Sequence, residues 1–147
     1  MGLPAVGRLL AVDWGAIRFG LALSDETQLI ASPLATLTRR AGKRFPMPAF
    51  LQLVTAHRPV GLVVGLPLTP EGAEGPAAVQ ARELAGLLGG RTYLPVELVD
   101  ERVTTARAHA AIREQGGSTR GRREDIDALA ATVLLQHFLE TRRHARS

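Results

Sequence analysis

The sequence predicts an α/β protein built on one mixed, five-stranded sheet with helices on both of its faces. Three apolar segments in the first 37 residues are separated only by short turns, which is the pattern of consecutive antiparallel strands. Further along the chain, apolar segments alternate with helical patterns, which indicates parallel strands joined by crossover helices. The chain has 147 residues, of which 46% are hydrophobic and 22% charged, enough for the core of one ordinary domain. We therefore expect a single domain over residues 1–147, with three antiparallel strands followed by parallel ones.

The first strands are predicted from residues 9–25, where two apolar runs flank a turn bounded by Gly15 and Gly20. Glycines that bound a short connection between β-favouring residues are typical of a hairpin. Residues 29–37 form the third expected strand. Because Pro33 cannot donate to a β-ladder, we expect this strand at an edge of the sheet.

The rest of the chain predicts alternating helices and strands, without a repeat or a linker. The continuous apolar run at 61–66 is typical of a strand covered on both faces. Pro76 fits the first position of a helix, and Gly89 with Gly90 fits a helix end. The expected elements are a helix at 45–57, a strand at 61–66, a helix at 76–88, a strand at 94–99, a helix from Thr104 or Thr105 to Gly116, and a helix at 125–141.

Three acidic residues lie where a ligand of such a sheet would bind. Asp13 ends the first strand, Glu101 follows the strand that ends at Val99, and Asp127 lies early in the last helix. Ligands of α/β sheets collect outside the carboxyl ends of the central strands. Burying the Asp13 carboxylate costs several kcal/mol unless a partner such as a metal ion compensates. Taken singly, each acid also fits a loop, a cap or a helix dipole, which is worth about 0.3–1 kcal/mol.

Composition narrows the class of partner. The net charge is +4, the sequence pI is about 10.9, and Lys43 is the only lysine. Arginine binds phosphates well, which favours nucleic acid, although a GC-rich genome would also explain the arginines. The chain has no cysteine, so a metal would need oxygen or imidazole ligands, and its four histidines are scattered. Without an apolar run of about 20 residues or a signal-peptide pattern, we expect a cytoplasmic protein with no membrane partner.

Several blocks of the sequence, in order from about residue 9 to residue 140, together resemble the YqgF/RuvX family. The blocks are Asp13-Trp14-Gly15, Arg18 to Asp25, Val64 to Pro67, Asp100 to Thr105, and Ile126 to Ala131. The resemblance implies a ribonuclease H-like fold and a hydrolase of ester bonds, a metal-dependent nuclease that leaves a 5′-phosphate and a 3′-hydroxyl. Members of the family are described as pre-16S ribosomal RNA nucleases or as Holliday junction resolvases.

We favour 5′ processing of pre-16S ribosomal RNA as the function, with Holliday junction resolution in DNA recombination and repair as the alternative. A junction resolvase makes paired cuts and needs two active sites, hence a homodimer, whereas a monomer can trim RNA. No strong dimerisation helix is evident in the sequence, but the sequence leaves the oligomeric state open.

By the same resemblance, Asp13, Glu101 and Asp127 are the catalytic and metal-binding acids. Two divalent ions about 3.5–4 Å apart can activate water and stabilise the leaving oxygen, and oxygen ligands suit Mg²⁺ or Mn²⁺. Asp13 is expected to bridge the two ions, with one other acid on each side. The family pattern also places a loop near the site at Gly65, Leu66, Pro67 and Thr104, with a glycine-acid loop at Gly72, Glu74 and Gly75.

Several arginines are candidates for phosphate contacts that would be salt-dependent and largely independent of sequence. They are Arg18, Arg102, Arg120, Arg122 and Arg123. The last three lie in a polar segment, 118–123, that could equally be a solvated turn. The chain departs from the family pattern at Ile17, where a lysine is common, and at Trp14, where a smaller or cyclic residue is frequent.

Two other classes share part of the pattern. Sugar kinases and actin-like ATPases resemble the opening motif, but they enclose a nucleotide between two such domains, which 147 residues cannot form. A non-catalytic nucleic-acid-binding module would use the arginines. It would have no reason to place three carboxylates near phosphates.

Overall fold

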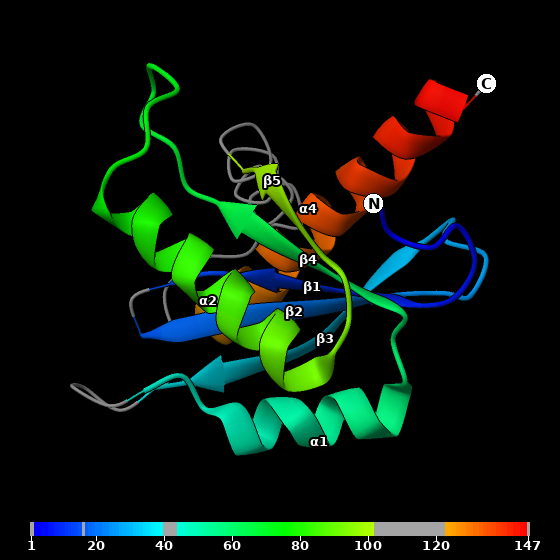
Figure 1. Ribbon diagram of the computed structural model, residues 1–147, viewed down its shortest axis with the longest axis horizontal. Coiled ribbons are helices and arrows are strands. Elements are labelled where there is room, and N and C mark those ends of the chain that lie inside the picture. The colour runs from blue at the N-terminus through cyan, green and yellow to red at the C-terminus, as the bar shows by residue number, and fades with distance from the viewer. Residues whose placement is uncertain (1, 16, 40–43, 102–122, 147) are drawn as a thin grey trace.

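The computed structural model describes residues 2–15, 17–39, 44–101 and 123–146, and within them the strands form a five-stranded sheet (Figure 1). The sheet order is β3-β2-β1-β4-β5. β1 pairs antiparallel with β2, as does β2 with β3, whereas β1 with β4 and β4 with β5 are parallel. The predicted mixed sheet is confirmed. Its strands are β1 (Leu9–Asp13), β2 (Arg18–Ser24), β3 (Ala31–Thr38), β4 (Gly61–Leu66) and β5 (Val96–Asp100).

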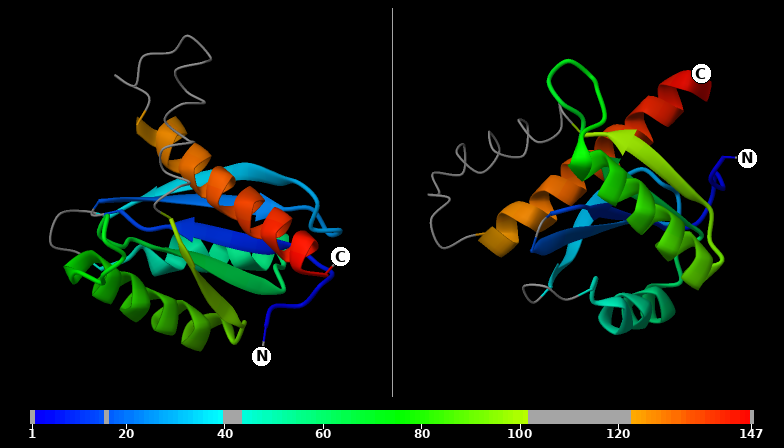
Figure 2. Two further views of the ribbon diagram at one scale, coloured as in Figure 1. Left: turned by 90° about the horizontal axis from the view of Figure 1, so that it is seen from above. Right: turned by 60° about the vertical axis from the view of Figure 1, so that its left-hand side comes forward.

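Helices cover both faces of this sheet, as predicted. α1 (Met47–His57) and α2 (Pro76–Thr92) lie on one face, and α4 (Arg123–Arg146) lies on the other (Figure 2). The helix expected from Thr104 or Thr105 to Gly116 lies outside the described residues. None of the described helices is both long and apolar enough to cross a membrane.

The alternation of side chains along β1 divides the core into two layers. Leu10 and Val12 pack with residues of α1 and α2, whereas Leu9 and Ala11 pack with residues of α4. Successive residues of a strand point to opposite faces. Asp13, which continues the second series, therefore belongs to the face that α4 covers.

The edge position predicted for β3 is confirmed, and Pro33 lies next to an irregularity in its pairing. Leu21 pairs with Ala35 and Ala22 pairs with Pro33, so Leu34 is an extra residue on the β3 side. Such a bulge is common at sheet edges. The strand begins at Ala31 rather than at residue 29.

Two expected helix ends are wrong, and each has a physical reason. α2 continues through Gly89 to Thr92 and ends at Tyr93, which is left-handed (φ 60°) and donates its N–H to the Gly89 carbonyl. A Cβ on Gly89 would lie 3.1 Å from Val96 Cγ2, so this glycine permits close packing of α2 on β5. α1 begins two residues later than expected because Pro46 occupies its N-cap position.

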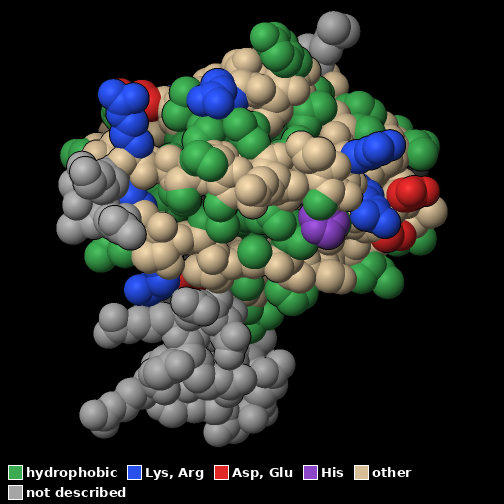
Figure 3. All heavy atoms as spheres, turned by 90° about the horizontal axis from the view of Figure 1, so that it is seen from below, with side chains coloured by type: hydrophobic (Ala, Val, Ile, Leu, Met, Phe, Trp, Pro, Cys, Tyr) green, Lys and Arg blue, Asp and Glu red, His purple; other side chains and the backbone are tan. Residues whose placement is uncertain are grey.

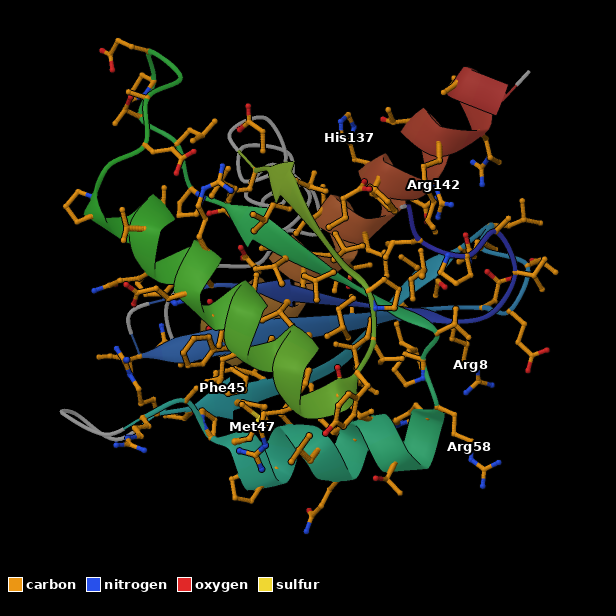
Figure 4. All side chains as sticks on the ribbon, viewed as in Figure 1. Arg8, Phe45, Met47, Arg58, His137 and Arg142 are labelled. Atoms are coloured by element: carbon orange, nitrogen blue, oxygen red, sulfur yellow. The ribbon has the colours of Figure 1, made fainter. Side chains whose placement is uncertain are left out.

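The last helix extends beyond residue 141 because arginines near its end bind the body of the protein. Arg142 donates to the carbonyl oxygen of Leu3 (2.8 Å) and to Oε1 of Gln28 (3.2 Å) (Figure 4). Arg143 donates to the carbonyl of Leu29 at 3.2 Å. These bonds hold the amino-terminal segment and the β2–β3 turn against α4.

The β2–β3 turn depends on the carboxylate of Asp25. It accepts hydrogen bonds from the backbone N–H groups of Leu29 (2.8 Å) and Ile30 (3.0 Å) and from the hydroxyl of Thr27. These bonds lower the pKa of Asp25 to about 2, with the bond from Ile30 as the largest cause. They also satisfy the N–H groups of residues 29 and 30, which explains why β3 starts later than expected.

We predict that Asp25→Asn lowers the free energy of unfolding by about 0.5–1.5 kcal/mol at pH 7, the range for solvent-exposed hydrogen bonds to a side chain. Because the folded pKa lies below the ordinary value of 3.8, this contribution is present above about pH 4 and is lost as the pH falls towards 2. Urea denaturation of both proteins at several pH values measures it. A difference that stays constant down to pH 2 would contradict this assignment.

Candidate active site

The carboxyl groups of Asp13 and Glu101 meet at the edge where β1, β4 and β5 end. Their side chains are hydrogen-bonded to each other. Asp13 is the last residue of β1, and Glu101 directly follows β5. The N–H of Glu101 donates to the carbonyl of Leu66, the last residue of β4, at 3.4 Å. Sheet order thus brings together two acids that are 88 positions apart in the sequence (101 minus 13).

Gly65 of β4 makes room for this pair. A Cβ at this position would lie 2.4 Å from Oε2 of Glu101 and 3.2 Å from Cδ2 of Leu134. Any side chain here would therefore displace the carboxyl group of Glu101. Gly65 is one of the residues predicted to lie near the site, and the structure gives it the role of a cradle for Glu101.

Burial is the largest cause that raises the pKa of both acids. Burial raises the pKa of Asp13 most; the hydrogen bond with Glu101 lowers it, and the charge of Asp127 raises it. Burial also dominates for Glu101, whose pKa rises to about 10, with further increases from the hydrogen bond and charge of Asp13 and from the charge of Asp100. With its pKa at about 10, Glu101 keeps its proton at neutral pH and donates it to the carboxyl group of Asp13.

Asp127 lies close enough to influence Asp13 but forms an ion pair with Arg18. The Nε of Arg18 donates to Oδ2 of Asp127 at 2.7 Å, and the two side chains are 29% and 24% exposed. Gly20 explains how α4 comes so near to β2, because a Cβ there would lie 1.8 Å from the carbonyl oxygen of Asp127. We expected Gly20 to bound the hairpin turn. It instead lies within β2, opposite Asp13.

The donor set at this edge fits a hard divalent cation. Asp13 and Glu101 supply carboxyl oxygens that are in contact, largely buried and costly to ionise together, and the Glu101 carboxyl group lies in the room left by the absent side chain of Gly65. No three acidic or histidine side chains among the described residues form a ready metal-binding group. The structure therefore joins two of the three predicted acids directly and holds the third, Asp127, on Arg18.

The other predicted site residues are distributed as follows. Leu66 is buried against Ala78 and Ala81 of α2, and Pro67 starts the loop that leads to α2. Within that loop, Glu74 forms two hydrogen bonds with Arg82, at 2.7 and 2.6 Å. Outside the described residues lie Arg102, Thr104, Arg120, Arg122 and the side chain of Arg123.

The two departures from the family pattern differ in their surroundings. The ring of Trp14 packs edge-on against Phe19, with 6.4 Å between the ring centroids, and Trp14 borders two of the apolar clusters. Its size therefore supports the core beside Asp13. Ile17 is 52% exposed, and its carbonyl accepts a hydrogen bond from the N–H of Arg39.

Comparisons with known proteins find a matching family model and similar proteins from several bacteria. The model of the RuvX family, described as Holliday junction resolvase, matches residues 7–141. A protein of Rhodopirellula baltica named "Putative pre-16S rRNA nuclease" is 40% identical over 144 residues, which is 97% of this chain and 82% of that protein. A protein with the same name from Mycobacterium sp. (strain KMS) is 39% identical over 145 residues, 98% of this chain and 86% of that protein.

Solved structures with the same arrangement include three resolvases. The fowlpox virus resolvase in complex with Holliday junction DNA matches with a TM-score of 0.57 and 12% identity, over 91% of this chain and 97% of that one. The yeast mitochondrial Holliday junction resolvase matches with a TM-score of 0.56 and 7% identity, over 99% of this chain and 82% of that one. RuvC of T. thermophilus, in complex with a Holliday junction substrate, matches with a TM-score of 0.50 and 20% identity, over 93% of this chain and 96% of that one. Because these identities are low, the matches show the fold alone. They confirm the predicted ribonuclease H-like sheet.

The raised pKa of Glu101 predicts that Glu101→Gln stabilises the protein at alkaline pH in the presence of EDTA. Because the folded pKa of about 10 exceeds the ordinary value of 4.5, the wild type loses stability as the pH rises from about 4.5 towards 10. A glutamine keeps the hydrogen bond to Asp13 and removes this loss, so we expect a gain of about 1–3 kcal/mol at pH 8. Urea denaturation at pH 5 and pH 8 measures it, and a variant that is less stable than the wild type at pH 8 would refute the assignment.

Proposed function

Because the chain belongs to the RuvX family, we propose that it is a divalent-metal-dependent nuclease that processes the 5′ end of pre-16S ribosomal RNA. The observation that carries this proposal is the buried carboxyl pair of Asp13 and Glu101, with Asp127 nearby. A buried acid pair of this kind reduces stability, so its presence at the carboxyl ends of the strands indicates function. The proposed substrate, pre-16S ribosomal RNA, is taken from the names of the similar proteins.

Asp13 and Glu101 would hold the metal, with Asp127 as the third acid. A bound divalent ion activates water for attack on phosphorus and neutralises charge on the leaving oxygen. Binding of the metal ion would require the loss of the proton shared by Asp13 and Glu101, because carboxylates are the ligands. The lack of a side chain at Gly65 leaves the Glu101 carboxyl group room to lie in this position.

Nucleic acid is the partner that the charge of the chain favours, and we place it at the edge where α4 begins. On the face that carries α1, the described arginines form separate spots, and some of them lie beside acidic side chains (Figure 3). The described side chains of that face therefore form no continuous basic surface for a phosphate backbone. An enzyme that processes a ribosomal RNA precursor would act in the cytoplasm. We also propose that residues 1–147 act as one domain.

Holliday junction resolution is the second candidate, favoured by the description of the family model. It requires two active sites at a fixed separation and hence a homodimer. A non-catalytic binding module is disfavoured by the cost of burying the Asp13 and Glu101 carboxyl groups beside phosphates.

We predict cleavage of an RNA that contains the pre-16S 5′ leader in the presence of Mg²⁺ or Mn²⁺, and none in EDTA. Asp13→Asn should lower the rate about 10²–10⁴-fold, because the interactions lost with a metal ligand amount to several kcal/mol. Gel analysis of end-labelled RNA measures both effects. The control is Arg91→Gln, at the far end of α2.

A four-way DNA junction assayed in parallel separates the candidates. Symmetric cuts in the junction by a dimer, with the RNA left intact, would replace RNA processing by junction resolution. Binding of either substrate without any cleavage in Mg²⁺ or Mn²⁺ would contradict the nuclease proposal.

A further inference from the structure

We propose that Arg18 is a positioning residue that connects Asp127 to the phosphate backbone of the bound nucleic acid. Its Nε holds Asp127, and its two Nη groups bind a phosphate beside the cleavage point. This inference rests on the proposed nuclease function. It goes beyond a simple phosphate contact because one guanidinium group holds the third acid and a substrate phosphate at the same time.

The ion pair uses only one edge of the guanidinium group. Nε donates to Oδ2 of Asp127 at 2.7 Å. An arginine side chain has five N–H donors, four of which belong to the two Nη atoms. In the described part of the chain, no acceptor other than Asp127 hydrogen-bonds to the Arg18 side chain. Its side chain is 29% exposed, so a ligand from solvent can reach it.

The position of Arg18 in the sheet places these donors beside the acid pair. Gly20 lies opposite Asp13, and Arg18 lies two residues before Gly20 on the same face of β2. Arg18 is therefore displaced from the level of Asp13 by about 7 Å along the strand. A phosphate next to the one held at Asp13 would lie within the range of so long a side chain.

Arginine is suited to this double role and lysine is not. The planar guanidinium group presents separate donors along different edges, so one edge can bind a carboxylate while another binds a phosphate. A lysine ammonium is a single point charge. At position 18, Asp127 and the phosphate would compete for the same ammonium group.

A purely structural role for Arg18 makes a different prediction. The pair joins the start of β2 to the start of α4 across 109 positions, and this tie alone would stabilise the fold. In that case Arg18 would influence nucleic-acid binding only through Asp127. Removing Asp127 would then abolish any effect of changing Arg18 on RNA affinity.

The test is a double-mutant cycle on RNA affinity in EDTA, where the RNA is not cleaved. Fluorescence anisotropy of a labelled pre-16S leader RNA is measured for the full-length wild type, Arg18→Gln, Arg18→Lys, Asp127→Asn, and Asp127→Asn combined with each change at Arg18. Arg91→Gln, which removes an exposed arginine from the last turn of α2, is the matched control. Thermal unfolding by circular dichroism checks that each variant is folded.

We expect Arg18→Gln to weaken RNA binding about tenfold, with or without Asp127, and to reduce the slope of log affinity against log salt by about 0.7–0.9. Asp127→Asn and Arg91→Gln should bind at least as well as the wild type. Arg18→Lys should bind weakly when Asp127 is present and recover affinity when Asp127→Asn removes the competing carboxylate.

Two results would overturn the inference while leaving the nuclease proposal intact: unchanged RNA affinity in both Arg18 variants, or an effect of Arg18→Gln that disappears in the Asp127→Asn background. If Arg18→Gln does not fold, the Arg18→Lys arm decides alone. A wild-type protein that binds neither RNA nor DNA would contradict the proposed function itself.

Discussion

The contact between the carboxyl groups of Asp13 and Glu101 is the interaction on which the rest of the site depends. Each acid ends or directly follows a strand, and β4 lies between those two strands. Burial raises the pKa of both groups, so the pair keeps a proton that two separate surface acids would lose. The fold tolerates this destabilising contact because the surrounding apolar core is large.

Two glycines let the acids come together in so small a space. Gly65 leaves room for the Glu101 carboxyl group, and Gly20 lets the backbone at Asp127 approach β2. Arg18 then holds the Asp127 side chain by an ion pair. The site is thus assembled from the carboxyl ends of β1, β4 and β5, the start of β2 and the first turns of α4, and the two glycines permit its close contacts.

Local patterns in the sequence were sufficient for the mixed sheet, since apolar periodicity identifies strands, and they placed Asp13 and Glu101 at or just after strand ends, where the two side chains meet. They were insufficient for contacts that depend on sheet order. Nothing near Arg18 in the sequence indicates a partner 109 residues away. Gly20 and Gly89 were misinterpreted for one reason: a glycine that permits close packing inside an element looks the same in the sequence as one that ends it. Gly20 carried a usable signal, because it lies within an apolar, strand-like run.

The most direct test of the site is the binding of Mn²⁺ by isothermal titration calorimetry, which requires no substrate. If Asp13 and Glu101 form the metal site, the wild type binds Mn²⁺, Asp13→Asn and Glu101→Gln each weaken binding at least about tenfold, and the remote acid variant Asp25→Asn binds like the wild type. Equal Mn²⁺ affinity in the wild type and in Asp13→Asn would contradict the assignment of this carboxyl pair as the metal site.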